Sequence, residues 1–121
     1  MNKNRKLREK DFKNLITKNG LKILIGQNNI ENDALTFRIA DKDDLWFHIK
    51  DIPGSHIILR VTGKTPTDDD IMQAAEAAVY YSKARGQKGL PVDFVKVRKI
   101  KKIKGSYLGN VSFKENKSII V

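Results

Sequence analysis

Alternating apolar and polar residues predict β-strands over most of this 121-residue chain. Two such runs flank Asn19-Gly20, and an Asn-Gly pair is the strongest short signal for a type I′ hairpin turn, since both turn residues need a positive φ. A second hairpin is expected near the C-terminal end, around Asn116. The polar stretch 27–33 is expected to be a loop. The expected strands are 12–17, 21–26, 35–40, 45–50, 56–62, 92–100, 107–113 and 118–121.

One segment carries the signals of a helix instead. Thr67 can cap its first turn, and Asp70 stands where a capping-box acid would. The helix is expected over about residues 68–85, with Gly86 able to end it in a left-handed conformation. Five strands, one helix and three strands in this order predict the α+β class, with a mainly antiparallel sheet and this principal helix packed on it.

The charge of the chain is large and unevenly distributed. Its 24 Lys and Arg residues against 14 Asp and Glu give a formal net charge of +10. Residues 1–22 hold eight of these cations and two acids, and residues 96–104 hold six cations and no acid. Two basic blocks on a nearly neutral body are typical of a protein that binds a polyanion. We expect one domain, residues 1–121, with a basic N-terminal arm at about 1–10.

Composition also narrows the class of protein and its compartment. The chain has no cysteine, which excludes disulfides and thiolate metal sites. No apolar run approaches the roughly 20 residues that a membrane-spanning helix needs. The first residues are basic and polar throughout, unlike a signal peptide. We therefore expect a cytoplasmic protein without a membrane partner.

The segment 44–60 places aromatic and polar residues on both sides of a Pro-Gly-Ser turn. Trp46 and His48 alternate with apolar residues along the first expected strand, so they should point away from the core. An antiparallel partner strand that contains His56 and Arg60 would complete one surface. On such a surface Trp46 offers a platform for a nucleic-acid base, a contact worth about 1–3 kcal/mol.

The turn itself supplies groups that suit an anion. Gly54 lets a backbone come close to a ligand, and Ser55 can bind a phosphate oxygen. The alternative interpretation is structural, with Trp46 half buried and His56 a hydrogen-bonded turn residue. The candidate contact residues, including the lysines of the second basic block, are Trp46, His48, Lys50, Asp51, Gly54, Ser55, His56, Arg60, Lys99, Lys101, Lys102 and Lys104.

A metal or acid–base site is another interpretation of His48, Asp51 and His56. A zinc site needs three or four ligands, and the sequence has no His-x-x-x-His pair to supply them. It also has no nucleophile–base motif, Walker loop or GxGxxG sequence. We therefore expect no metal, no cofactor, no small-molecule substrate and no enzymatic activity.

Several motifs carry a resemblance to a known family. The longest is DLWFHIKDIPGSHIIL at 44–59, and a GxNxxxND motif formed by Gly26, Asn28, Asn32 and Asp33 precedes it, followed by Leu35-Thr36. AAxxAxYYSKAR at 74–85, PVDFVKV at 91–97 and KKIKG at 101–105 complete the set. On these motifs almost the whole chain, residues 12–121, resembles the NFACT-R domain, the RNA-binding-type module of the NFACT proteins of ribosome quality control.

The resemblance implies binding to structured RNA, either tRNA or RNA of the large ribosomal subunit, with ribosomal proteins as further partners. It also makes the GxNxxxND loop a candidate contact, although Gln27 and Glu31 leave that loop less positive than is usual in the family. Some family members are named fibronectin-binding proteins. The alternative function is therefore a protein-interaction module, docking on a ribosomal protein or a fibronectin-type ligand without binding nucleic acid.

Overall fold

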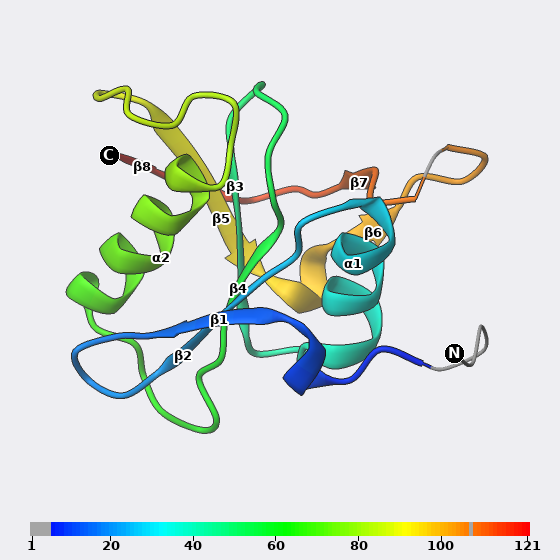
Figure 1. Cartoon of the computed structure of the whole chain (residues 1–121), viewed down its shortest axis with the longest axis horizontal. Helices are drawn as coiled ribbons and strands as arrows, with labels where there is room; N and C mark the ends of the chain where they lie inside the picture. The colour runs from blue at the N-terminus through cyan, green and yellow to red at the C-terminus, as the bar shows by residue number, and fades with distance from the viewer. Residues whose placement is uncertain (1–5, 107) are drawn as a thin grey trace.

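The computed structural model describes residues 6–106 and 108–121. Its centre is a six-stranded sheet in the order β1-β2-β4-β3-β5-β8, and every pairing in it is antiparallel (Figure 1). This confirms the prediction of an α+β fold built on an antiparallel sheet. The strands of the sheet are β1 (Lys13–Ile16), β2 (Lys22–Ile25), β3 (Leu45–Ile49), β4 (Ile57–Leu59), β5 (Pro91–Lys96) and β8 (Lys117–Ile120).

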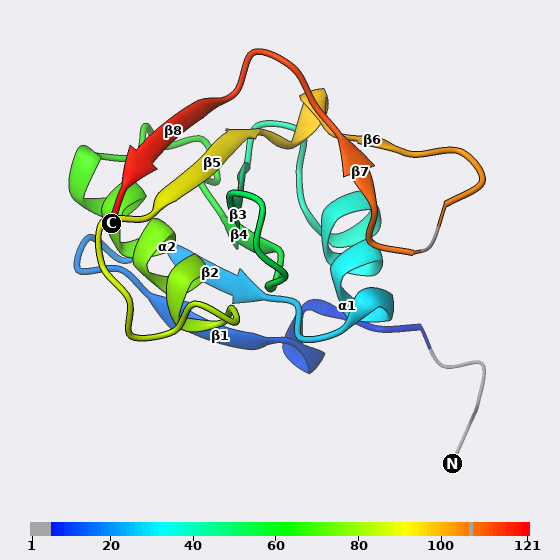
Figure 2. The same cartoon turned by 90° about the horizontal axis from the view of Figure 1, so that it is seen from above.

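Helix α2 (Asp68–Tyr80) packs on one face of the sheet through small residues (Figure 2). Four of its alanines are buried, so the helix backbone comes close to the strands. Fully burying apolar side chains of the Leu and Ile type contributes about 1.5–3 kcal/mol each. The buried residues of this core are Leu21, Ile23, Ile25, Leu45, Phe47, Ile49, Ile57, Leu59, Ala74, Ala75, Ala77, Ala78, Val79, Ala84 and Val92.

The start of α2 also anchors the turn between β1 and β2. Thr67 Oγ1 accepts the backbone N–H of Asp70 at 3.1 Å, and the Asp70 carboxylate accepts that of Thr67 at 2.9 Å, as the capping box predicts. Asn19 donates to Thr67 Oγ1 at 3.1 Å. Burial alone would raise the pKa of Asp70, but hydrogen bonds from Thr67, Thr17 and Asn19 outweigh it and lower that pKa.

Helix α2 ends at Tyr80 rather than near residue 85. The chain leaves the helix because residues 81–83 pair with the Pro-Gly-Ser turn between β3 and β4. These contacts run from the Ser55 N–H to the Tyr81 carbonyl (3.0 Å), from the Lys83 N–H to the Pro53 carbonyl (3.1 Å) and, as an isolated antiparallel bridge, between Gly54 and Ser82.

An outer layer covers the opposite face of the sheet (Figure 2). It consists of α1 (Asn29–Ala34), the π-helical turn η2 (Leu35–Ile39) and the ribbon of β6 (Lys101–Lys102) and β7 (Val111–Ser112). The 3₁₀ turns η1 (Glu9–Asp11) and η3 (Val97–Lys99) flank it. The second core, which lies beneath this layer, comprises Phe12, Leu24, Leu35, Trp46, Ile58, Val95, Val97 and Ile100.

The predictions of a loop at 27–33 and a strand at 35–40 are wrong. Asn28 caps α1 by accepting the Glu31 N–H at 2.8 Å, and η2 continues the helix to Ile39. The wide turn of η2 is closed from the Ala40 N–H to the Leu35 carbonyl at 2.9 Å. A segment this short does not complete enough turns to show a helical period, so its Leu-Thr-Phe-Arg-Ile alternation has the appearance of a strand.

The predicted C-terminal hairpin is also wrong. β7 pairs with β6, and β8 pairs with β5 in the main sheet, so the segments on either side of Asn116 belong to different sheets. Pairing β8 with β5 satisfies the backbone of a strand that would otherwise form an open edge. Tyr107, the first residue of the predicted strand 107–113, lies outside the described residues.

The first hairpin forms as predicted, but with a different turn. Gly20 has φ +88°, whereas Asn19 does not have the positive φ that a type I′ turn requires. The Gly20 N–H donates to the Thr17 carbonyl at 2.9 Å, and the Thr17 N–H donates to the Leu21 carbonyl at 2.8 Å. This is the three-residue loop that ends in a left-handed glycine. Of the predicted basic arm, residues 1–5 lie outside the described part of the chain.

Arg60 follows β4 and is held by three carboxylates instead of lying open on a surface. Its Nε lies 2.9 Å from Asp44, while its two terminal nitrogens lie 2.9 Å from Asp41 and 2.6 Å from Glu9. Burial raises the pKa of Asp44, although the backbone N–H groups of Val61 and Asp41 and the Arg60 charge oppose that rise. Arg60 was expected among the nucleic-acid contacts, and in this arrangement its guanidinium is already occupied.

Replacing Arg60 with methionine is expected to lower the free energy of unfolding by about 3 kcal/mol. The substitution keeps an unbranched apolar stem but leaves the buried Asp44 carboxylate without its counter-ion. Urea denaturation followed by circular dichroism measures the loss. Lys64→Met, at an exposed position, is the control and should change stability by less than about 0.5 kcal/mol. Equal small losses in both variants would contradict a structural role for Arg60.

Candidate nucleic-acid interface

The GxNxxxND motif and the longest motif, at 44–59, meet in one buried polar network. Asn32, from α1, accepts the backbone N–H of His56 on its side-chain oxygen at 3.1 Å. The Gly26 N–H donates to the His56 carbonyl at 3.0 Å. The His56 imidazole is within hydrogen-bond distance of the Thr36 hydroxyl, with 2.9 Å between Nδ1 and Oγ1. GxNxxxND and Pro-Gly-Ser-His therefore join the outer layer to the sheet.

Each residue of the GxNxxxND motif makes a contact that stabilises the fold. A Cβ on Gly26 would overlap the side-chain oxygen of Asn32 and lie 3.0 Å from its Cα. Asn28 caps α1, where Glu31 also accepts the Gln27 N–H at 3.1 Å. Asp33 forms an ion pair with Lys102 at 3.1 Å. Glu31, which departs from the family pattern, thus completes the helix start.

His56 is buried and uncharged near neutral pH. Burial, and to a lesser extent the neighbouring His48, lowers its pKa to about 3. Hydrogen bonds to the backbone of Gly109 and Asn32 act in the opposite direction but are weaker. The residue is 4% exposed, so its ring does not offer a face to a base or an edge to a phosphate. The expectation that His56 lies on an open surface is therefore wrong, because the outer layer covers it.

Trp46 is likewise covered, at 2% exposure. The ring of His48 stacks on it at 5.8 Å, and Phe113 from the segment after β7 lies at 5.0 Å. The expected open platform at Trp46 is therefore absent. His48 is partly buried, and burial lowers its pKa despite the carbonyls of Ile49 and Gly54 and the charge of Asp93.

Position 54 must be a glycine because Ser82 and Ile49 pack closely against it. A Cβ at this position would lie 2.9 Å from the Cβ of Ser82 and 3.3 Å from a methyl carbon of Ile49. Ser55 is buried beside it. The turn residues Lys50 and Asp51 are exposed, and Asp51 has φ +58°. The close approach at Gly54 is thus to Ser82, just after α2, whereas the sequence predicted an approach to a ligand.

The lysines of the second basic block point in different directions. Lys99 pairs with Glu115 at 3.1 Å, and Lys102 pairs with Asp33 of α1. Lys101 and Lys104 are exposed and form no ion pair with a described residue. Lys101 borders a hollow of about 340 Å³, which we call the basic hollow. Its lining residues are Arg98, Lys99, Lys101, Ser112, Phe113, Lys114 and Glu115.

A second hollow, of about 430 Å³, lies where the loop motif and the Pro-Gly-Ser turn meet the end of α2. We call it the polar cleft. Sequence reasoning missed Tyr80, Lys83 and Arg85 at this site, although all three belong to the YYSKAR motif, because they were assigned to the end of the helix. The other lining residues are Gln27, Asn28, Asn29, Asn32, Pro53, Gly54, Ser55, Tyr81 and Ser82.

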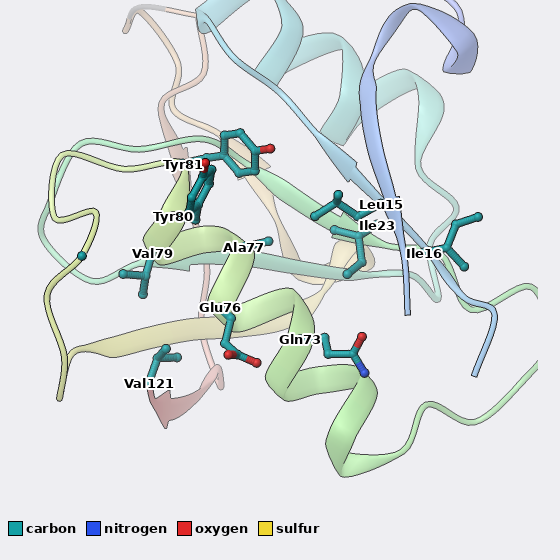
Figure 3. Close-up of a pocket in the computed structure, with 11 residues that line it drawn as sticks. Leu15, Ile16, Ile23, Gln73, Glu76, Ala77, Val79, Tyr80, Tyr81 and Val121 are labelled. Atoms are coloured by element: carbon teal, nitrogen blue, oxygen red, sulfur yellow. The ribbon is translucent and has the colours of Figure 1, made fainter. Parts of the chain in front are cut away.

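A third hollow, of about 710 Å³, is mainly apolar and lies against α2 (Figure 3). Leu15 and Ile23 from the β1–β2 hairpin face it from one side, and Tyr80 stands at its upper end. Leu15, Ile16 and Tyr80 are 43%, 64% and 48% exposed. We call this surface the apolar groove.

Comparison with known proteins identifies the family. Residues 11–115 match the family described as "NFACT protein RNA binding domain", NFACT-R. The chain belongs to the NFACT-R family. This confirms the resemblance seen in the motifs, and the description of the family names RNA binding and no reaction.

The relatives of this NFACT-R chain are longer proteins. It is 44% identical over 102 residues to the Rqc2 homolog RqcH of Bacillus subtilis and 41% identical over 114 residues to the Rqc2 homolog RqcH of Streptococcus suis. These matches cover 84% and 94% of this chain but only 18% and 20% of the relatives, so the chain spans about a fifth of their length.

A solved structure confirms the fold of the NFACT-R chain. The C-terminal part of the fibronectin/fibrinogen-binding protein of Streptococcus suis matches it with a TM-score of 0.88 and 36% identity. The match covers all of this chain and 47% of that one. Within the described residues of the NFACT-R chain, no group of three His, Cys, Asp or Glu side chains could hold a metal ion, and no helix is long and apolar enough to cross a membrane.

Replacing Gly26 with alanine is expected to lower the free energy of unfolding by about 1–3 kcal/mol. The added Cβ displaces the Asn32 side chain, which leaves the buried His56 N–H without its acceptor. Thermal melting measures the loss. Asn29→Ala is the control, because it lies on the exposed side of α1. A Gly26→Ala protein as stable as the control variant would show that the network tolerates the shift.

The stability of the protein is expected to fall as the pH is lowered from about 6.5 toward about 3. The unfolded His56 takes up a proton near 6.5, whereas the folded residue stays neutral down to about 3, so protons favour the unfolded state in this window. One such histidine contributes a slope of up to about 1.4 kcal/mol per pH unit. Urea denaturation at several pH values measures it, and His56→Gln should flatten the slope. An unchanged slope in that variant would refute the assignment.

Proposed function

We propose that this domain binds structured RNA, either tRNA or RNA of the large ribosomal subunit, as part of translation-linked ribosome quality control in the cytoplasm. The observation that carries the proposal is the match of residues 11–115 to an RNA-binding domain family. Relatives named Rqc2 homolog RqcH support the ribosomal context, and the net charge of +10 suits a polyanionic partner. Ribosomal proteins near the bound RNA would be secondary partners.

The basic hollow is the surface that best suits phosphates. Lys101, which lines the hollow, and Lys104, which lies in the β6–β7 connection beyond it, have no acidic partner among the described residues, so a phosphate would gain their full attraction. Lys99 and Lys102 must first give up a carboxylate, so each should contribute less net affinity. Lys101 and Lys102 point to opposite faces of β6, as alternation along a strand requires, so they would not bind the same phosphate.

A protein partner is the second candidate, and the apolar groove favours it. Its exposed Leu15, Ile16 and Tyr80 form a surface of the kind that marks protein-interaction sites. The solved relative is named a fibronectin/fibrinogen-binding protein, which suggests a ligand of that type, while a ribosomal protein would fit the first context. Salt dependence separates the two functions, since an apolar interface depends on salt far less than phosphate contacts do.

The double substitution Lys101→Glu/Lys104→Glu is expected to weaken RNA binding of every sequence. Two lost phosphate contacts should lower the slope of log affinity against log salt by roughly 1.4–1.8. Fluorescence anisotropy with a labelled tRNA, at several salt concentrations, measures both quantities. Lys18→Glu/Lys64→Glu is the matched control, because it changes the net charge equally at exposed lysines away from the hollow. Equal losses in both variants would mean that net charge, rather than the position of Lys101 and Lys104, decides binding.

A further inference from the structure

We propose that the polar cleft binds an unpaired nucleotide of the RNA, as a contact separate from the basic hollow. The inference rests on the proposed function, since it names a part of the RNA and the surface that takes it. Of the residues first expected to form the site, Gly54 and Ser55 line the cleft, whereas Trp46 and His56 are buried elsewhere and take no part in it.

The lining of the cleft has the chemistry of a nucleotide site. Lys83 and Arg85 are exposed, and neither forms an ion pair with a described residue. Gln27 and Asn29 add exposed amide side chains, which can donate to and accept from the edges of a base. The lining contains no carboxylate. Cations and amides without acids suit an anion that also carries hydrogen-bonding edges.

Tyr80 supplies the stacking surface that Trp46 does not. Its side chain is 48% exposed at the end of α2. The guanidinium carbon of Arg85 lies 3.7 Å from the centre of the Tyr80 ring, so the guanidinium covers one face of the ring and a base would stack on the other face or on the guanidinium. Tyr81 packs edge-on at 4.9 Å and restricts the orientation of the ring. An aromatic ring and a guanidinium plane are the two groups on which unpaired RNA bases stack.

The cleft also lies close to the proposed phosphate surface. Asn29 lines the cleft at the start of α1, and a Cβ on Gly109 of the β6–β7 connection would lie 3.4 Å from its side-chain oxygen. The connection of the β6–β7 ribbon therefore lies next to the rim of the cleft, and Figure 1 shows the ribbon beside α1. An unpaired extension of an RNA held by the ribbon would enter the cleft past Asn29, in whose lining Tyr80 also lies.

The test compares an RNA hairpin with the same hairpin carrying an unpaired 3′ tail of several nucleotides, by fluorescence anisotropy. One stacked base should make the tailed RNA bind about tenfold more tightly to the unaltered protein. Tyr80→Ala should abolish this gain and leave the affinity for the blunt hairpin unchanged. Tyr80→Phe, which keeps the ring, should retain most of the gain. Lys101→Glu/Lys104→Glu should weaken both RNAs and preserve their ratio.

The outcomes separate this inference from the proposed function. Failure of the unaltered protein to bind either RNA overturns both. Binding without a gain from the tail, or a gain that survives in Tyr80→Ala, overturns the polar cleft alone. Lys83 and Arg85 lie near the end of α2, where cations also offset the helix dipole. Lys83→Gln is the second variant, for the case in which Tyr80→Ala fails to fold, and thermal melting checks that it is stable. If the stable Lys83→Gln protein no longer binds the tailed RNA more tightly than the blunt hairpin, the result supports the cleft. If the gain in affinity from the tail is unchanged, the result counts against it.

Discussion

The uncharged, hydrogen-bonded imidazole of His56 is the constraint on which the layering of this domain depends. It lies beneath the outer layer, with Thr36 and Asn32 of the α1–η2 segment on one side and the aromatic rings of the second core on the other. A buried polar group without partners costs a few kcal/mol, so these partners must all be in position together. The outer layer is therefore fixed by polar contacts as well as by apolar burial. Because the β6–β7 ribbon is part of that layer, the same contacts help to fix its position relative to the sheet.

That constraint explains why the residues that identify the family are mostly hidden. Gly26, Asn32 and His56 hold the layers together, and Gly54 allows the end of α2 to lie against the turn. The surfaces that can meet a partner are made by the side chains next to these positions. Within each motif, buried residues hold the fold and their exposed neighbours are free to bind. The exposed cations therefore stand on a rigid support.

Sequence patterns predicted the parts of the fold whose signals are local. The capping box of α2, the β1–β2 hairpin and the alternation along β3 are each set by neighbouring residues. The alternation of residues along β3 could not show that both of its faces are covered. A face with polar and aromatic side chains can lie against solvent or against a second layer that offers polar partners. The burial of Trp46, the helical form of η2 and the pairing of β8 depend on contacts between distant segments. The same limit hid the polar cleft, whose walls come from three separate motifs.

The order of strands in the sheet has a consequence for how the chain is made. The strand at its centre, β3, pairs with β4 a few residues later, but its other edge must wait for β5, whose Asp93 lies opposite His48 across about 45 residues of sequence. In a chain that emerges from its N-terminal end, β1 to β4 are therefore available before β5, and until β5 follows the backbone groups along one edge of β3 have no partner strand. Pairing across such long separations slows folding, and open strand edges favour association between chains. The α2 segment lies between β4 and β5 in the chain, so the helix that covers the apolar face of these four strands is available before the strand that closes the edge of β3.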